Sequence, residues 1–338
     1  MINVTGLSKR YGTHLAVENV NFQIKKGEVI GFLGPNGAGK STIMNILTGY
    51  LSMTQGKVEI DGFDIAEHPE DAKRRIGYLP EIPPLYTDMK VKEYLGFIYD
   101  LKKVKFPKKP HIEEILKLIK IDHVQNRLIK NLSKGYRQRV GFAQALIGNP
   151  DVLILDEPTV GLDPKQIIEI RNLISRLGKN HTIILSSHIL SEIQAVCKRV
   201  IIINRGQIIA DDLTENLANK ISFDSSLVAR IVCAEKEMLE ALSSVRGVAS
   251  VTSLGRKEEG TCDFLIEPKK GFDVRADVFE RVVSRGKTLL SLNNNNASLE
   301  QIFLRLTDAD NDEARRMLSG ETTEIEIEEE AEENDSDI

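Results

Sequence analysis

A glycine-rich segment between an apolar run and a helix-forming run is the first part of this sequence that could do chemistry. It spells G-x-x-x-x-G-K-S from Gly34 to Ser41. Glycines let the backbone fold into a cradle of inward-pointing N–H groups, and a following helix adds partial positive charge. Lys40 can reach the β- and γ-phosphates of a nucleotide, and the Ser41 hydroxyl can hold Mg²⁺. Because a strand-like run precedes the loop and a helical run follows it, a chance match is disfavoured. The pattern predicts binding of a nucleoside triphosphate.

Two further groups could complete a site for phosphate chemistry. The continuous apolar run at 152–155 ends in Asp156 and Glu157. Asp156 suits a water-mediated Mg²⁺ ligand, and Glu157 could take a proton from an attacking water. His188 ends another apolar run, and the carboxyl ends of parallel strands face one crevice, where ligands bind. Acidic pairs and single histidines are common, so by themselves they are weak evidence for a catalytic site. Their presence in the same sequence as the glycine-rich loop strengthens that evidence.

Three other positions could contact a nucleotide, each with an ordinary alternative. Tyr11 could stack on a purine ring, or it could be a simple hairpin tyrosine. Glu81 follows a predicted strand at 76–79 and could reach a metal, or it could be a solvent-exposed carboxylate. Ser133 is placed to cap a helix, and with Gly135 it would suit a second anion site.

The elements that position these side chains follow from periodicity. Alternating apolar and polar residues predict half-buried strands, and continuous apolar runs predict strands buried on both faces. Residues 88–148 carry apolar side chains at helical spacing instead, so we expect a helical region there. The predicted strands are 2–7, 17–24, 29–33, 56–65, 76–79, 152–155 and 182–188, followed by a helix and the segment 201–209.

The remainder of the chain has a different pattern. Between residues 221 and 306 the segments alternate as β-α-β-β-α-β, which is typical of a small ferredoxin-like domain. A capping box of Ser298 and Gln301 predicts one more helix. Residues 321–338 contain eight Glu and two Asp with no Lys or Arg. Such a tail is too poor in apolar residues to fold alone, so we expect it to be disordered.

Bulk properties are those of a soluble globular protein with about two domains. The net charge is −5, but without the ten carboxylates of the tail the rest of the chain carries +5. Three widely spaced cysteines predict reduced thiols rather than disulfides or a metal site. No apolar run reaches the ~18 residues of a membrane helix, so we expect a cytoplasmic protein. The basic linker at 102–110 is more simply a solvated loop than a contact for anionic lipid headgroups.

Taken in order, these motifs resemble those of the ATP-binding cassette (ABC) ATPases over roughly residues 2–215. The segment 153–157 matches Walker B, and LSKGY at 132–136 matches the signature. Leu162 and Asp163 match the D-loop, and His188 the switch histidine. Tyr11 matches the adenine-stacking aromatic. Walker A is matched by Gly34, Pro35, Asn36, Gly37, Ala38, Gly39, Lys40, Ser41 and Thr42.

The resemblance implies a homodimer with two ATP molecules at its interface. Each ATP would lie between Walker A of one protomer and Ser133 and Gly135 of the other. It also implies Mg²⁺ held by Ser41, Asp156 and Glu81. Four positions depart from the family pattern, namely Lys134, Tyr136, Val160 and Glu81, which stands in place of the usual glutamine. Because Glu157 and His188 are present, we expect hydrolysis as well as binding.

The resemblance is strongest to ATPase subunits of ABC-2-type transporters of the gliding-motility and multidrug-export branch. It implies an α/β P-loop cassette at 1–218 with a helical subdomain at about 85–148. A ferredoxin-like α+β domain at 219–307 and an acidic tail at 308–338 would follow. The implied partner is an integral-membrane permease that places the protein on the inner face of the cell membrane.

A soluble ABC ATPase acting on nucleic acid or in cofactor assembly is the alternative. Chromosome-maintenance members insert a long coiled coil between Walker A and Walker B, whereas Lys40 and Asp156 are 116 positions apart here. Translation-factor members carry two cassettes, and iron–sulfur assembly members usually lack a second domain. We therefore expect a transport motor and no nucleic acid partner.

Overall fold

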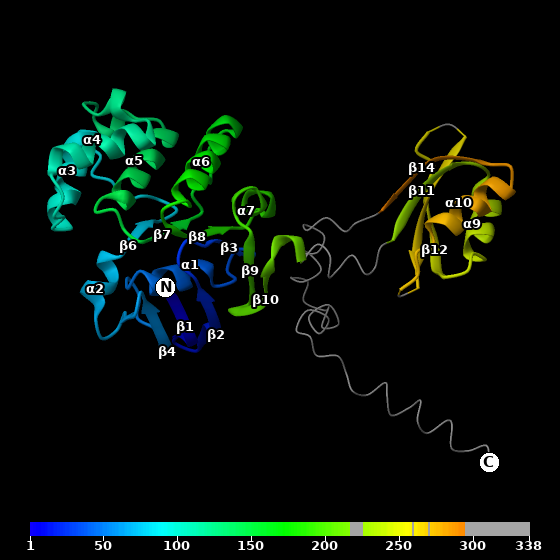
Figure 1. The fold of residues 1–338 in the computed structure, drawn as a ribbon, viewed down its shortest axis with the longest axis horizontal. Coiled ribbons are helices and arrows are strands. Elements are labelled where there is room, and N and C mark those ends of the chain that lie inside the picture. The colour runs from blue at the N-terminus through cyan, green and yellow to red at the C-terminus, as the bar shows by residue number, and fades with distance from the viewer. Residues whose placement is uncertain (217–225, 259, 270, 295–338) are drawn as a thin grey trace, which may run out of the picture. The chain divides into compact units, whose positions relative to one another are not determined.

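A computed structural model describes residues 1–216, 226–258, 260–269 and 271–294 (Figure 1). These residues form two compact units, the first spanning Met1–Thr214 and the second beginning at Glu215. Within the described ranges, no helix has the length and apolar character needed to cross a membrane. Each unit has its own apolar core and is described separately.

A six-stranded sheet is the centre of the first unit. Its strand order is β10-β9-β3-β8-β7-β6, and all neighbours are parallel except β10 and β9. The strands are β3 (Val29–Leu33), β6 (Ile76–Leu79), β7 (Val152–Asp156), β8 (Thr182–Ser187), β9 (Arg199–Asn204) and β10 (Gln207–Leu213). Every residue of β7 and β8 is buried, as the continuous apolar run at 152–155 predicted for β7. The segment 201–209 forms parts of two strands with a turn between them.

The first unit also contains a four-stranded antiparallel sheet, which shares an apolar core with α1 and the central sheet. Its order is β2-β1-β4-β5, with β1 (Ile2–Tyr11), β2 (His14–Ile24), β4 (Gln55–Ile60) and β5 (Phe63–Asp64). The helix α1 (Lys40–Leu47) contributes Ile43 and Met44 to the core that the two sheets share. The rings of Phe22 on β2 and Phe32 on β3 pack edge to face between the sheets, with their centroids 5.1 Å apart. This packing fixes the helix that follows the glycine-rich loop.

Most of residues 88–148 form helices, as the sequence predicted. Figure 1 shows α3, α4 and α5 gathered beyond the β6 edge. Two short 3-10 turns, η1 (Asp122–Val124) and η2 (Ile129–Asn131), separate α4 from α5. The helices are α2 (Pro69–Arg74), α3 (Val91–Leu101), α4 (Lys108–Ile119), α5 (Lys134–Leu146), α6 (Pro164–Leu177) and α7 (Leu190–Val196).

In the described residues from 226 to 294, the second unit has an antiparallel sheet of order β12-β13-β11-β14 and two helices. Its elements are β11 (Leu227–Val232), α9 (Glu235–Ser243), β12 (Val248–Gly255), β13 (Thr261–Pro268), α10 (Arg275–Ser284) and β14 (Thr288–Asn294). Its core includes Ile231, Met238, Phe264 and Val278. This is the order of strands and helices that the sequence predicted. The helix expected after Ser298 and the acidic tail lie outside the described residues.

The carboxyl end of α5 is held by a lysine from the neighbouring helical segment. Lys102 Nζ donates to the carbonyl oxygens of Ile147 at 3.0 Å, Gln144 at 3.4 Å and Ala145 at 3.5 Å. The last carbonyls of a helix have no partner within it, so this contact satisfies them. Burial lowers the pKa of Lys102 from its ordinary value of 10.5 to about 8.

This shift predicts a pH-dependent contribution to stability. Between pH 8 and 10.5 the unfolded chain binds more protons at Lys102 than the folded chain, so the free energy of unfolding rises with pH. We expect the difference in unfolding free energy between wild type and Lys102→Met to move by about 2 kcal/mol in favour of wild type from pH 7 to 9.5. Urea titrations of both proteins at each pH measure it. A difference independent of pH would contradict the prediction.

Candidate functional site

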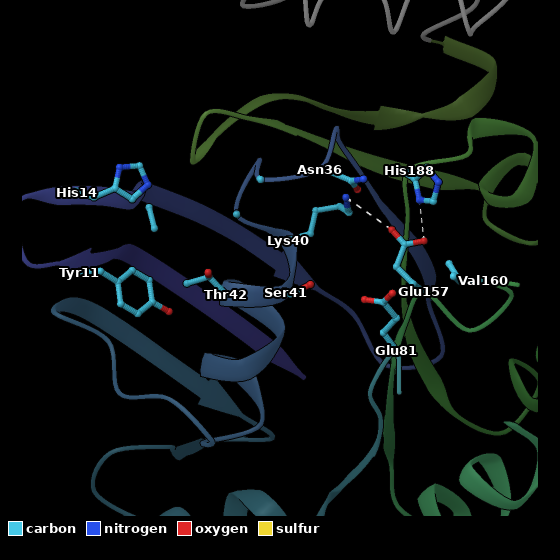
Figure 2. A pocket seen from close by; sticks show the side chains of 13 residues that line it. Tyr11, His14, Asn36, Lys40, Ser41, Thr42, Glu81, Glu157, Val160 and His188 are labelled. Atoms are coloured by element: carbon cyan, nitrogen blue, oxygen red, sulfur yellow. Dashed lines mark hydrogen bonds and ion pairs between the residues drawn. The ribbon is translucent and has the colours of Figure 1, made fainter. Parts of the chain in front are cut away.

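Predicted site residues from five separate segments meet in one pocket of about 460 Å³. It lies at the carboxyl ends of the parallel strands β3, β7 and β8, where ligands of open α/β sheets bind. Figure 2 shows Tyr11 and His14 at one end and Lys40, Glu157 and His188 at the other. The lining residues are Tyr11, His14, Ala16, Asn36, Gly37, Gly39, Lys40, Ser41, Thr42, Glu81, Glu157, Val160 and His188.

The loop between β3 and α1 has the close backbone packing that a phosphate cradle requires. A Cβ at Gly34 would lie 2.4 Å from the carbonyl oxygen of Ile203, so no side chain fits there. Gly39 precedes α1 with φ of +106°, a conformation that side chains disfavour, and its Cβ would lie 2.9 Å from the carbonyl oxygen of Ala16. The loop therefore needs glycine at both positions to present its N–H groups.

Lys40 places a buried positive charge inside this cradle. Its side chain is 6% exposed, and Nζ donates to the carbonyl oxygens of Gly34 at 2.7 Å and Pro35 at 3.2 Å. Burial lowers the pKa of Lys40, and the carboxylates of Glu157 and Asp156 oppose that shift. A buried cation beside a cradle of backbone N–H groups fits an anionic phosphate chain.

Glu157 is the buried carboxylate opposite Lys40. Its Oε1 lies 3.7 Å from Lys40 Nζ, and its Oε2 lies 3.0 Å from Nδ1 of His188, a bond in which Nδ1 donates when Glu157 is ionised. Burial raises the pKa of Glu157, while the hydrogen bond from His188 and the charge of Lys40 lower it. A carboxylate poised between these influences is suited to accepting a proton.

The backbone at Glu157 is strained. Its φ is +47°, which is uncommon for a residue with a side chain and concentrates at functional sites. The turn directs Glu157 into the pocket, whereas Asp156 stays in the buried strand. This explains how two adjacent carboxylates occupy different environments, as the sequence predicted.

Ser186 joins the two carboxylates, and sequence reasoning missed it. Its Oγ donates to Asp156 Oδ1 at 2.5 Å and accepts from the Glu157 backbone N–H at 3.0 Å. Ser186 is opposite Asp156 in the parallel pairing of β7 with β8. The sequence shows only a pair of serines at the end of an apolar run. That Ser186 lies beside Asp156 can be inferred only when the strand order is known.

The oxygen donors near the pocket fit a hard divalent cation. Ser41 and Glu81 line the pocket, and Asp156 lies beneath it with its carboxylate bonded to Ser186. Hydroxyl and carboxylate oxygens are the ligands that Mg²⁺ prefers, with substrate phosphates and waters completing its shell. Within the described residues, no group of three or more His, Cys, Asp or Glu could hold a metal by itself.

Tyr11 lines the far end of the pocket. Its side chain is exposed, and Lys9 Nζ lies 5.3 Å from the ring centroid. His14, its partner across the β1–β2 hairpin, also lines the pocket and was not predicted from the sequence.

The signature residues do not line this pocket. Ser133 caps α5, and its Oγ accepts the backbone N–H of Tyr136 at 3.5 Å. A Cβ at Gly135 would lie 2.6 Å from the side chain of Gln166, so α5 packs closely against the start of α6. At this helix start Ser133 is exposed and Gly135 is buried.

Comparisons with known proteins identify similar sequences. The family model described as "ABC transporter" matches residues 17–160. The bacitracin transport ATP-binding protein BcrA of Bacillus licheniformis is 40% identical over 213 residues, covering 62% of this chain and 69% of BcrA. The linearmycin resistance ATP-binding protein LnrL of Bacillus subtilis is 30% identical over 319 residues, covering 91% and 98%.

A solved structure has the same fold as the first unit. The dimeric cassette MJ0796, in a post-hydrolysis state bound to ADP and Pi, is 26% identical with a TM-score of 0.58. The match covers 63% of this chain and 98% of the cassette. The covered share corresponds in size to the unit that holds the pocket.

Replacement of Ser186 tests the structural support of the acidic pair. Ser186→Ala leaves the buried N–H of Glu157 without its partner, at a cost of about 1–3 kcal/mol. We expect nucleotide affinity within about threefold of wild type but a phosphate-release rate lowered about tenfold, about 1.4 kcal/mol in the barrier. Ser191→Ala, at an exposed position on α7, is the control. Equal rates for the two variants would show that Ser186 does not support Glu157.

Proposed function

Because this chain belongs to the family of ABC transporter ATP-binding proteins, we propose that it is the ATP-hydrolysing motor subunit of an exporter. The observation that carries the proposal is the cluster of Lys40, Glu157 and His188 at the end of a phosphate cradle. The protein is an ATPase whose hydrolysis drives substrate movement through a separate membrane subunit.

The relatives support export rather than another use of ATP. BcrA is named for bacitracin transport and LnrL for linearmycin resistance. A third relative, SrtF of Streptococcus pyogenes, is named as a lantibiotic transport ATP-binding protein and is 38% identical to this chain over 232 residues. We infer a permease partner in the membrane and a peripheral location on its inner face.

The pocket accounts for how this chain would bind ATP. Tyr11 would stack on the adenine, and the segment from Gly34 to Thr42 would surround the phosphates. Lys40 would exchange its backbone carbonyl partners for the β- and γ-phosphate oxygens, a favourable exchange because phosphate carries full negative charge. The buried location strengthens this attraction relative to the same pair in water.

Hydrolysis would use Glu157 as the general base. The water oxygen forms a bond to the γ-phosphorus, the bond from that phosphorus to the bridging oxygen breaks, and the water proton passes to Glu157. His188 Nδ1 orients the carboxylate through the 3.0 Å hydrogen bond. Positioning and charge stabilisation supply most of the rate enhancement in phosphoryl transfer.

Mg²⁺ would be held by Ser41, Asp156 and Glu81 together with phosphate oxygens. When bound, the ion neutralises part of the phosphate charge. Ser186 keeps the Asp156 carboxylate in a fixed orientation through its 2.5 Å hydrogen bond. Glu81, where the family usually has glutamine, would add a negative charge to this donor set.

We propose that two copies of the chain form the working ATPase. Each ATP would lie between the cradle of one protomer and Ser133 and Gly135 of the other. The capped start of α5 has backbone N–H groups and partial positive charge suited to a phosphate. The dimeric state of MJ0796 supports this arrangement.

Outside the cassette, which we place at residues 1–218, we assign a ferredoxin-like class to residues 219–307. The sheet order β12-β13-β11-β14 with helices after the first and third strands supports that class. We keep the acidic tail at 308–338 as a separate segment without a role in catalysis.

Glu157→Gln should trap a nucleotide-bound dimer. The amide cannot accept the water proton, so ATP with Mg²⁺ should accumulate at the interface. We expect gel filtration to give a dimer with ATP and Mg²⁺ and a monomer without them. Lys40→Ala in the Glu157→Gln background is the control, because it removes the phosphate contact and should stay monomeric. A size that does not depend on nucleotide would rule out the proposed switch.

Glu81→Gln should change the dependence on metal in two opposite ways. A neutral amide is a weaker ligand for a hard cation, so half-maximal ATPase should require more Mg²⁺. It also removes negative charge near the γ-phosphate, so affinity for metal-free ATP should increase. Titration of ATPase against Mg²⁺ and ATP binding in chelator measure both effects. Glu240→Gln, an exposed change on α9, is the control, and two unmoved curves would leave Glu81 as a solvent carboxylate.

A further inference from the structure

A buried carboxylate outside the pocket connects the two loops that carry Glu157 and His188. Glu192 lies on α7 and is 6% exposed. Its Oε2 accepts two hydrogen bonds, from Thr159 Oγ1 at 2.5 Å and from Ser187 Oγ at 3.0 Å. All three residues are buried.

The two hydroxyls belong to the loops that form the catalytic pair. Thr159 is two residues after Glu157, and Ser187 immediately precedes His188. Ser187 Oγ also accepts the backbone N–H of Ile189 at 3.0 Å, which fixes the chain on both sides of His188. The 3.0 Å hydrogen bond between His188 and Glu157 thus spans two loops that Glu192 holds together.

A second anchor shows that the loop after Glu157 is attached on more than one side. Gln138 Nε2, on the capped helix α5, donates to the carbonyl oxygen of Pro158 at 3.1 Å. Glu192 approaches the next residue, Thr159, from α7. The strained turn at Glu157 is therefore followed directly by two tethers to different helices, which is how such strain is maintained.

Burying a carboxylate at position 192 is energetically less favourable than burying an apolar side chain, if the position serves only for packing. Burying an ion costs several kcal/mol unless its oxygens are bonded, and an apolar residue of similar volume is often as stable or more so. A polar group that is buried where an apolar residue would be preferred is expected at positions where function requires it. Packing alone thus gives no reason for glutamate at this position.

We propose that Glu192 is a positioning residue for hydrolysis, which holds His188 against Glu157 by tying Thr159 to Ser187. The inference rests on the proposed function, since it assumes that Glu157 and His188 act in catalysis. Glu192 lies outside the residues that line the pocket, so it acts through the hydroxyls and not on ATP. Loss of the link should lower turnover and leave ATP binding largely intact.

The matched pair Thr159→Val and Thr159→Ser tests the link with little change in volume. Valine has the shape of threonine without the hydroxyl, and serine keeps the hydroxyl. We expect Thr159→Val to lower kcat about tenfold with KM for ATP within about twofold, and Thr159→Ser to retain kcat within about threefold. Gln194→Ala, exposed on α7, is the control for nonspecific effects. Equal losses in the valine and serine variants would overturn the proposal.

A spectroscopic measurement tests the positioning independently of activity. In protein labelled with ¹⁵N-histidine, the His188 signal is the one lost in His188→Ala. Thr159→Val should shift that signal and leave those of the distant His68 and His123 unchanged, whereas Thr159→Ser should not shift it. An unshifted His188 signal in Thr159→Val would refute the link.

The two proposals can fail separately. If Glu157→Gln or His188→Ala keeps wild-type ATPase, the proposed catalytic roles are wrong, yet the histidine signals still report whether Thr159 and Glu192 position His188. If both variants are inactive and Thr159→Val has wild-type kcat, the catalytic roles stand and the inference about Glu192 is wrong. Thermal melting of each variant separates these results from loss of fold, which would lower kcat in parallel with Tm.

Discussion

The organisation of the first unit depends on holding a positive charge in a buried position. Lys40 is nearly enclosed, and burial alone disfavours its charged form. The carbonyl oxygens of Gly34 and Pro35 and the carboxylate of Glu157 offset that cost. These contacts hold Lys40 within the loop between β3 and α1.

The carboxylate opposite has the complementary constraint. Burial raises the pKa of Glu157, and the hydrogen bond from His188 and the charge of Lys40 oppose that rise. Lys40 provides one partner and His188 the other, from loops that are far apart in sequence. Because the sheet places β3, β7 and β8 next to one another, these loops meet at one edge.

Near Lys40 and Glu157, the buried carboxylates are hydrogen-bonded by hydroxyl groups. Ser186 bonds to both Asp156 and the backbone of Glu157, and Thr159 and Ser187 share Glu192. Hydroxyls can donate and accept in turn, so they satisfy buried carboxylates without adding another charge. These hydrogen bonds lie on both sides of the strained backbone turn at Glu157.

Local sequence was sufficient for the parts of the structure that depend on short segments. The glycine spacing from Gly34 to Ser41 identified the cradle, because only glycine fits its backbone geometry. Apolar runs placed the buried strands, and Ser133 marked the start of α5. The order of elements in the second unit also followed from periodicity, since each strand and helix there carries its own repeat.

Tertiary structure alone decided which distant residues become partners. Ser186, His14 and Glu192 are not distinguishable in the sequence from other serines, histidines and glutamates. Their roles arise from the strand order, from the pairing of β7 with β8 and from the packing of α7. For Ser133 and Gly135, the resemblance already implied a role at the ATP of a second protomer, and in the fold neither lines the pocket of its own chain. Spacing along a chain specifies backbone geometry within a loop, whereas contacts across a sheet depend on how all of its strands assemble.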